Sequence, residues 1–195
     1  MSQPPDKPKN ETTWTDGGPT PGGPRDKSFA YRQSRKAFIA SCEKAGADVV
    51  GRVHPAKGPD GLPLFLDAAA FGPRLAPAGV LVVGYGIAAS VVMMTLLADK
   101  KAMALAPGVR LVLVHGANPA VIAYNDPARD DPAWSAKMLA AVVTEDLRKA
   151  QRLTVIGLGG PAEFPAPAGI ALSRSVVAAG GAAKVAIVAA IRAAG

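Results

Sequence analysis

The chain has 195 residues, of which 49% are hydrophobic, and this is enough to bury one ordinary core. Its formal net charge is +7, but the 22 Lys and Arg residues are scattered and aromatic residues make up only 5%. This composition excludes the basic, aromatic-rich surface of a nucleic-acid-binding protein. Cys42 is the only cysteine, which excludes an internal disulfide and a cysteine-rich zinc module and favours a reducing, cytoplasmic compartment.

Residues 1–27 are rich in proline, glycine and charge, and they contain no apolar run. We predict a disordered leader without a secretory signal, followed by one domain over residues 28–195. Residues 75–98 carry no charge, which raises the question of a membrane span. Pro77 and three glycines interrupt this segment, so we predict a strand, a tight turn and a helix, and no membrane association.

The first predicted elements are a helix and a hairpin. Ser28 is a suitable N-cap for a helix through Ala45, and Gly46 follows where a C-terminal glycine is expected. Residues 48–53 and 62–71 alternate as two strands around a turn at 58–61. A strand at 79–84, a helix at 87–106 and a strand at 109–114 then predict a right-handed crossover with a parallel strand pair.

The second half continues the alternation of helices and strands. Asp131 is predicted to cap a helix that begins at Pro132 and carries Trp134, Met138 and Val142 on one stripe. A strand follows at 152–158. Residues 167–181 and 182–195 predict two helices of small residues, although the first segment also fits a strand. The fold class is therefore a single α/β domain with a largely parallel sheet, an N-terminal hairpin and flanking helices.

Ligands bind such sheets at the carboxyl ends of the strands, where GYGIAAS, HGANP and GLGGP stand in this chain. Gly84, Gly86 and Ala89 satisfy the G-x-G-x-x-A pattern of a dinucleotide-binding turn. The next strand, however, ends at His115 and Asn118 and lacks the acidic residue that holds a ribose. We favour a tight strand-to-helix turn, and NAD(P) binding by a Rossmann-type protein remains the alternative.

A resemblance covers residues from about Ser28 to Asn118. The blocks YRQSRKAFIASCEKAGA, HPAKGPDGLPLFLDAAAFGP, VLVVGYG and LAPGVRLVLVHGANP resemble, in this order, the N-terminal half of a bacterial zinc-carboxypeptidase-like family of uncharacterised hydrolases, in the carboxypeptidase A superfamily. This resemblance implies a truncated hydrolase-like α/β domain. The family's substrate-binding Arg and Asn residues have no counterpart in AVIAYNDPARDD.

The resemblance also implies three zinc-ligand positions. In that family the turn after the Val-rich strand reads S-G-T-H-G-x-E-G, whose His and Glu bind zinc, and a later strand ends in D-L-H. Here Ala88 stands at the His, Val91 at the Glu, and Gly157 and Gly159 stand at the Asp and the last His. None of these side chains coordinates a metal, and a catalytic zinc site needs three protein ligands. We therefore expect no catalytic residues, no metal and no cofactor.

Other catalytic patterns are equally weak. His54 and His115 are the only histidines, and each lacks clustered metal-binding partners. Ser41 and Lys44 have S-x-x-K spacing on a helical face, and Ser90 lies outside a G-x-S-x-G elbow. Asp126, Asp130 and Asp131 fit a helix-entry loop better than a cation site.

The sequence thus predicts a catalytically inactive carboxypeptidase-like protein that acts, if at all, as a binding module. His115, Asn118 and Gly159 are its ligand-cleft candidates. A decaying gene without function is a further alternative. We also expect association, either as a homodimer or with a protein partner, because the strand at 152–158 is predicted to be left as an uncovered edge.

Overall fold

The computed structural model describes residues 29–57, 63–124, 126–165 and 167–195. The predicted leader, its Ser28 cap and the turn at 58–61 lie outside the described residues. Helices and strands alternate along the rest of the chain. In order, the elements are α1 (Phe29–Lys44), β1 (Val49–Lys57), β2 (Pro63–Phe71), β3 (Ala78–Gly84), α2 (Ile87–Leu97), β4 (Val109–His115), α3 (Pro119–Tyr124), η1 (Pro127–Arg129), α4 (Pro132–Asp146), β5 (Arg152–Leu158), β6 (Ala171–Val177) and α5 (Gly181–Ala194).

The six described strands form one sheet in the order β1-β2-β4-β3-β5-β6. The hairpin β1–β2 is antiparallel, and β2 joins β4 in antiparallel register. The strands β4, β3, β5 and β6 are parallel to one another. The predicted single α/β domain with an N-terminal hairpin and a largely parallel sheet is confirmed.

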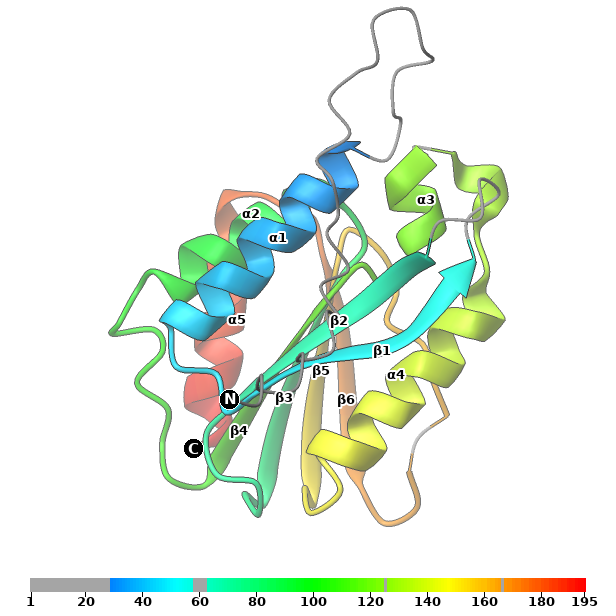
Figure 1. Cartoon of the computed structure of the whole chain (residues 1–195). Helices are drawn as coiled ribbons and strands as arrows, with labels where there is room; N and C mark the ends of the chain where they lie inside the picture. Colours follow the sequence, from blue (N-terminus) through cyan, green and yellow to red (C-terminus); the bar gives the residue numbers. More distant parts are fainter. Residues whose placement is uncertain (1–28, 58–62, 125, 166) are drawn as a thin grey trace, which may run out of the picture.

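Helices cover both faces of the sheet. Figure 1 shows α1, α2 and α5 on one face and α4 on the other. Consecutive strand residues alternate between the two layers, because Val80 and Val82 pack with α2 and α5 whereas Leu81 and Val83 pack with α4. Every residue of β3 and β4 is buried, as expected of central strands covered on both faces. None of the described helices combines the length and apolar composition needed to cross a bilayer.

Several local signals in the sequence act as predicted. Gly46 ends α1 with φ +80, a left-handed conformation that glycine adopts without steric cost. The Asp131 carboxylate accepts the Trp134 amide at 2.9 Å and caps α4, whose first residue is Pro132. Met138 and Val142 are buried beneath this helix.

The prediction for the helix after β3 is wrong in length. Instead of continuing to residue 106, α2 ends at Leu97. The cause is Asp99, whose carboxylate accepts the amides of Lys101 at 3.0 Å and Ala102 at 3.1 Å. A short acidic side chain that bonds the backbone ahead of it favours a turn over a further helical turn.

Two predictions for the C-terminal part need correction. Residues 171–177 form the strand β6, so the strand interpretation of that segment is right and the helix interpretation is wrong. The strand β5 is not an uncovered edge, because it pairs with β3 on one side and β6 on the other. The edge at this end of the described sheet is β6.

Candidate functional site

A cleft lies where β3, β4 and β5 end, which is the position that a parallel sheet gives to a ligand. We call it the carboxyl-end cleft. Its volume is about 290 Å³. Each of the three strands contributes residues just past its end, and the start of α4 closes one side. The lining residues that carry chemistry are Tyr85, Asn118, Asp130, Ser135 and Glu163, together with the backbone of Gly159 and Gly160.

Backbone bonds between neighbouring turns hold the floor of the cleft. The Tyr85 amide donates to the Leu158 carbonyl at 3.1 Å, and the Ala117 amide donates to the Gly84 carbonyl at 3.0 Å. The turn after β5 passes close to the turn after β3, because a Cβ added at Gly160 would lie 2.8 Å from the Tyr85 ring. A larger residue at Gly160 would push the two turns apart.

Asn118 forms one wall. Its side-chain amide donates to the Asp130 carboxylate, and its carbonyl oxygen accepts the Val121 amide at 3.4 Å. Ser135 on α4 donates its hydroxyl to the Ala117 carbonyl at 2.6 Å. These bonds fix Asn118 and Asp130 relative to the end of β4, so the wall is formed before any ligand arrives.

The charge of the cleft is opposite to that of the chain. Asp130 and Glu163 are its charged lining residues, and no Lys or Arg is among the described residues that line it. Burial raises the pKa of the Tyr85 phenol, and the negative charges of Asp130 and Glu163 raise it further. Tyr85 therefore stays protonated and offers both a donor and an acceptor at neutral pH.

The structure brings two of the three predicted cleft residues together. Asn118 and Gly159 both line the carboxyl-end cleft, and Gly159 adopts φ +78 in the turn after β5. His115 lies elsewhere. It is 1% exposed beneath α1, where its ring stacks on Phe38 at 5.2 Å and its Nε2 lies 3.1 Å from the Ser34 hydroxyl.

The environment of His115 keeps its ring neutral. Burial, and to a smaller extent the nearby Arg35 guanidinium, lower its pKa to about 4. Arg35 also donates two hydrogen bonds to the buried Asp67 carboxylate, at 2.5 and 2.9 Å. Cys42, on the same helix, has its pKa raised to about 12 by burial and by Asp67 and Glu43, so its thiol stays protonated. These groups build the α1–sheet contact.

The residues of the dinucleotide pattern occupy the start of α2. Gly84 is packed so closely that a Cβ there would meet Met93 at 2.8 Å, and Ala89 is buried in the core. Gly86 is the N-cap of α2 in extended conformation, with open space where a Cβ would be. Of the whole pattern, only Tyr85 lines the carboxyl-end cleft.

The zinc-ligand positions implied by the resemblance do not fit a metal. Ala88 and Val91 are exposed on α2 and carry no donor atom. A Cβ at Gly157 would lie 2.1 Å from the Gly160 carbonyl oxygen, so a side chain of any kind is excluded unless the turn moves. Across the described ranges no three His, Cys, Asp or Glu side chains lie close enough to hold a metal ion.

The remaining sequence candidates take structural roles. Ser41 and Ser90 donate to carbonyls one helical turn earlier, at 2.8 and 3.4 Å. Asp126 caps η1 by accepting the Ala128 amide at 3.0 Å. As for His54, its side chain lies outside the described residues. The cleft residues that sequence reasoning missed are Tyr85, Asp130 and Glu163; each follows a strand or precedes a helix, but nothing local shows which way it points.

Comparison with known proteins places the chain in a family. The sequence pattern of the family described as "Protein of unknown function (DUF2817)" matches residues 28–131, more than half of the chain. The chain belongs to this family. The DUF2817 match includes Tyr85, Asn118 and Asp130 and ends before Gly159 and Glu163, so the β5 side of the carboxyl-end cleft lies outside it. No curated protein matches the chain.

Solved structures similar to this DUF2817 chain include two glutaminyl cyclases and an esterase. The Tannerella forsythia glutaminyl cyclase is 11% identical with a TM-score of 0.41, over 65% of this chain and 53% of that one. The Macrostomum lignano glutaminyl cyclase is 15% identical with a TM-score of 0.42, over 65% and 45%. The Bacillus subtilis carboxylesterase CesB is 16% identical with a TM-score of 0.38, over 66% and 41%. The chain spans about half the length of these proteins.

Proposed function

We propose that this DUF2817 chain has kept a carboxypeptidase-like domain without zinc-dependent hydrolysis, and that it binds a small ligand bearing an amino or other cationic group in the carboxyl-end cleft. The observation that carries the proposal is the lining of the cleft. It combines two carboxylates, a protonated phenol and a fixed amide with exposed glycine backbone, and no basic side chain is among its described residues.

The absence of zinc-dependent hydrolysis is proposed because the side chains at the expected ligand positions carry no metal-binding atoms. Metal-assisted hydrolysis uses zinc to lower the pKa of a bound water from 15.7 to about 7, and the metal must be held by three protein ligands beside an open position. The resemblance places Ala88, Val91 and two glycines at those positions, and at Gly157, near the end of β5, the following turn leaves no room for a side chain. The polar groups that line the cleft can therefore bind and orient a ligand, and they do not supply zinc-dependent hydrolysis.

The second part rests on charge and size. Glu163 is exposed beside the cleft, and Asp130 keeps one carboxylate oxygen besides the one that accepts from Asn118. A cationic group between them gains charge-assisted hydrogen bonds, which are about twice as strong as neutral ones. A volume of about 290 Å³ is at the small end of ligand pockets, so the ligand is of amino-acid size rather than of cofactor size.

The test is a thermal-shift and calorimetric titration of the purified chain with alaninamide, which carries an amino group and no carboxylate. N-acetyl-alaninamide is the matched ligand without the charge. At a hundredfold excess over the dissociation constant, binding stabilises the native state by about 2.7 kcal/mol, a shift of several degrees for a chain of this size. We expect this shift with alaninamide and none with the acetylated compound.

Two variants locate the binding. Glu163→Gln is expected to weaken alaninamide at least about fivefold, because it removes one partner of a charge-assisted bond. Glu145→Gln, at the far end of α4 and exposed, is the control and should bind as the wild type does. Equal binding of the acetylated compound, or no binding of either, contradicts the proposed ligand class.

The same titration includes zinc and NAD. One tightly held zinc per chain would contradict the loss of metal chemistry. A saturable shift with NAD that is abolished by Gly86→Val would favour the dinucleotide alternative, since a side chain at Gly86 blocks the approach of a pyrophosphate to the start of α2. A folded chain that responds to none of the probes would leave the decaying-gene alternative.

A further inference from the structure

The strand β6 (Ala171–Val177) is an exposed strand at one edge of the described sheet. It pairs with β5 on one side, and no described strand pairs with its other side. Five of its seven residues are exposed, and Val176 is 61% exposed. Among the described elements no further strand pairs with its outer side, whereas natural proteins usually protect long edge strands from further pairing.

The outward backbone groups of β6 follow from its bonds to β5. The Ala171 amide donates to the Gln151 carbonyl at 2.8 Å, and the Val177 carbonyl accepts the Gly159 amide at 3.0 Å. Because the amide and carbonyl of alternate strand residues point to opposite sides, Leu172, Arg174 and Val176 direct theirs away from β5. These three residues offer a new strand a row of donors and acceptors.

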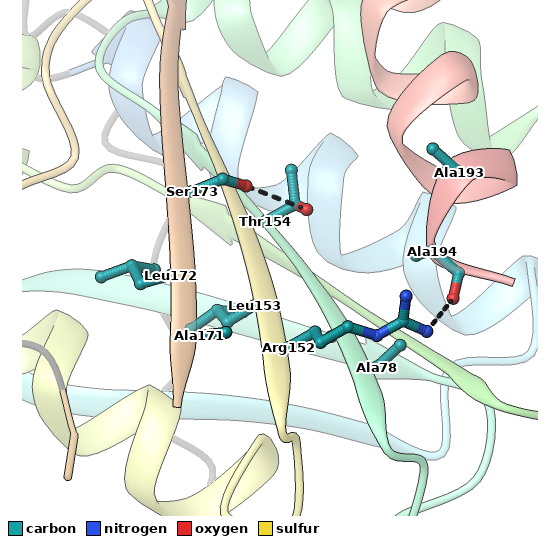
Figure 2. Close-up of a pocket in the computed structure, with 10 residues that line it drawn as sticks. Ala78, Arg152, Leu153, Thr154, Ala171, Leu172, Ser173, Ala193 and Ala194 are labelled. Atoms are coloured by element: carbon teal, nitrogen blue, oxygen red, sulfur yellow. Dashed lines mark hydrogen bonds between the residues drawn. The ribbon is translucent and has the colours of Figure 1, made fainter. Parts of the chain in front are cut away.

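A groove lies beside the start of β6, between β5, β6 and the end of α5. Its volume is about 280 Å³. Figure 2 shows the Ser173 and Thr154 hydroxyls joined, at 3.3 Å, on the side of the strands that faces α5. One guanidinium nitrogen of Arg152 donates to the Ala194 carbonyl at 3.3 Å, and the Arg152 side chain stays exposed at the groove. The groove accepts a polar or negative side chain from a strand added to β6.

The C-terminal segment that contains β6 carries charge of one sign. From residue 164 to residue 195 the chain contains Arg174, Lys184 and Arg192 and no acidic residue. Lys184 pairs with Asp99 at 2.7 Å, whereas Arg174 is exposed and donates to the Phe164 carbonyl at 2.7 Å. Arg152 on β5 adds to the positive potential at the groove. An acidic segment therefore complements this edge electrostatically.

A second copy of the chain does not complement it. Arg174 is the central residue of β6, so a symmetric antiparallel pair of β6 strands places two Arg174 residues opposite each other, which is destabilising. The strand at the other edge of the described sheet, β1, also contains Arg and Lys and no acidic residue in its sequence VVGRVHPAK. Pairing that edge with β6 of a neighbour would again join two basic strands.

We propose that β6 is a docking edge for an extended acidic segment of another protein, which adds as a seventh strand and places an acidic side chain in the groove beside Arg152. Its backbone bonds to Leu172, Arg174 and Val176, and its apolar side chains cover Val176. The groove lies at the opposite end of the strands from the carboxyl-end cleft, and docking at β6 does not depend on ligand binding in that cleft.

The probe is a labelled seven-residue peptide of alternating Asp and Val, titrated into the full chain and followed by fluorescence anisotropy. We expect saturable binding that weakens with salt, because the attraction is between exposed charges. Amide hydrogen exchange on the complex identifies the site, and we expect added protection at Leu172, Arg174 and Val176. Arg152→Gln should weaken binding about threefold, whereas Lys36→Gln, exposed on α1, should not.

Two control peptides separate strand addition from simple charge attraction. A peptide with Lys in place of Asp should fail to bind. An Asp-Val peptide with alternate amides N-methylated along one edge keeps the charge and loses the strand bonds, so it should bind at least tenfold more weakly. Retained binding of either peptide, absence of binding by the parent peptide, or protection of the β6 amides through dimerisation in light scattering would each overturn the proposal.

Discussion

At the residue scale, His115 is a buried residue that packs between α1 and the sheet. Its ring packs against the Phe38 and Tyr31 rings, with centroids at 5.2 and 6.0 Å, and its Nε2 lies 3.1 Å from the Ser34 hydroxyl. The Nδ1 atom has no hydrogen-bond partner among the described residues. A protonated ring there would place a charge in a nearly dry site beside Arg35, which is why its pKa falls to about 4.

The consequence is a loss of stability in mild acid. The unfolded chain binds a proton at His115 below pH 6.5, whereas the folded chain stays neutral there until about pH 4. Between these values the unfolded state holds more protons, so the free energy of unfolding falls as the pH falls, by up to about 1.4 kcal/mol per pH unit. We expect His115→Phe to flatten this slope in urea titrations from pH 7 to 4. An unchanged slope in the variant would place the titrating group elsewhere.

At the scale of the elements, the segments at the ends of the parallel strands differ in how closely they are packed. The turn after β5 folds back so far that the Gly160 carbonyl occupies the place of a side chain at Gly157. At the start of α2, by contrast, the surroundings of Gly86 are open and its φ of −169 suits any residue. Gly157, near the end of β5, and Gly86, at the start of α2, therefore differ in what they tolerate.

This difference is measurable by substitution. Gly157→Ala is expected to cost at least about 2 kcal/mol, because a methyl group must displace a backbone carbonyl, and the melting temperature should fall by several degrees. Gly86→Ser should be neutral or stabilising by about 0.5 kcal/mol, since serine supplies the side-chain N-cap that α2 lacks. Equal stability of Gly157→Ala and the wild type would contradict the close packing of this turn.

The elements also show what the sequence could and could not predict. The hairpin, the β3–α2–β4 crossover and the Asp131 cap depend on local patterns, and all of them were predicted. The end of α2 at Leu97 depends on a single side-chain bond from Asp99, which competes with a helix-forming sequence. Residues 171–177 were ambiguous because an edge strand exposed on both faces has no apolar alternation to reveal it.

For the candidate site, prediction from the sequence is limited because the site depends on contacts between segments that are far apart in the chain. Asn118 and Gly159 were predicted because each follows a strand of a parallel sheet, and all such ends meet at one edge. The burial of His115 could not be predicted, because its partner Ser34 lies 81 residues away. The order of the strands is equally nonlocal, and for this reason β5 was wrongly placed at the edge.

At the scale of the whole molecule, Arg110 connects three segments that are far apart in the sequence. It is 1% exposed on β4 and donates to Asp48 before β1 at 3.0 Å, to the Gly72 carbonyl after β2 at 2.5 Å and to Asp146 at the end of α4 at 3.2 Å. One side chain thus connects β4 with the segments before β1 and after β2 and with the end of α4.

Removing this cation should destabilise the whole domain. Arg110→Met leaves Asp48 and Asp146 without their shared partner, and we expect a loss of about 3 kcal/mol in urea unfolding. Arg110→Lys should recover part of the loss, because lysine restores the charge but not the fork of donors. Arg74→Met is the control: Arg74 is 70% exposed and 3.8 Å from Asp48, and its removal should change stability by less than about 0.5 kcal/mol. Similar losses for Arg110→Met and Arg74→Met would contradict this role.

The strand order β4-β3-β5 has a consequence for how the protein is made. When residue 115 has left the ribosome, β1 to β4 can assemble into a four-stranded sheet, but one edge of β3 must wait for β5, which is complete only at residue 158. At translation rates of about 5–20 residues per second, that edge is open for several seconds. The exposed strand, AGVLVVG, is entirely uncharged and rich in valine, a sequence prone to pairing with other nascent chains. The middle of the sheet is therefore where newly synthesised chains most need a chaperone.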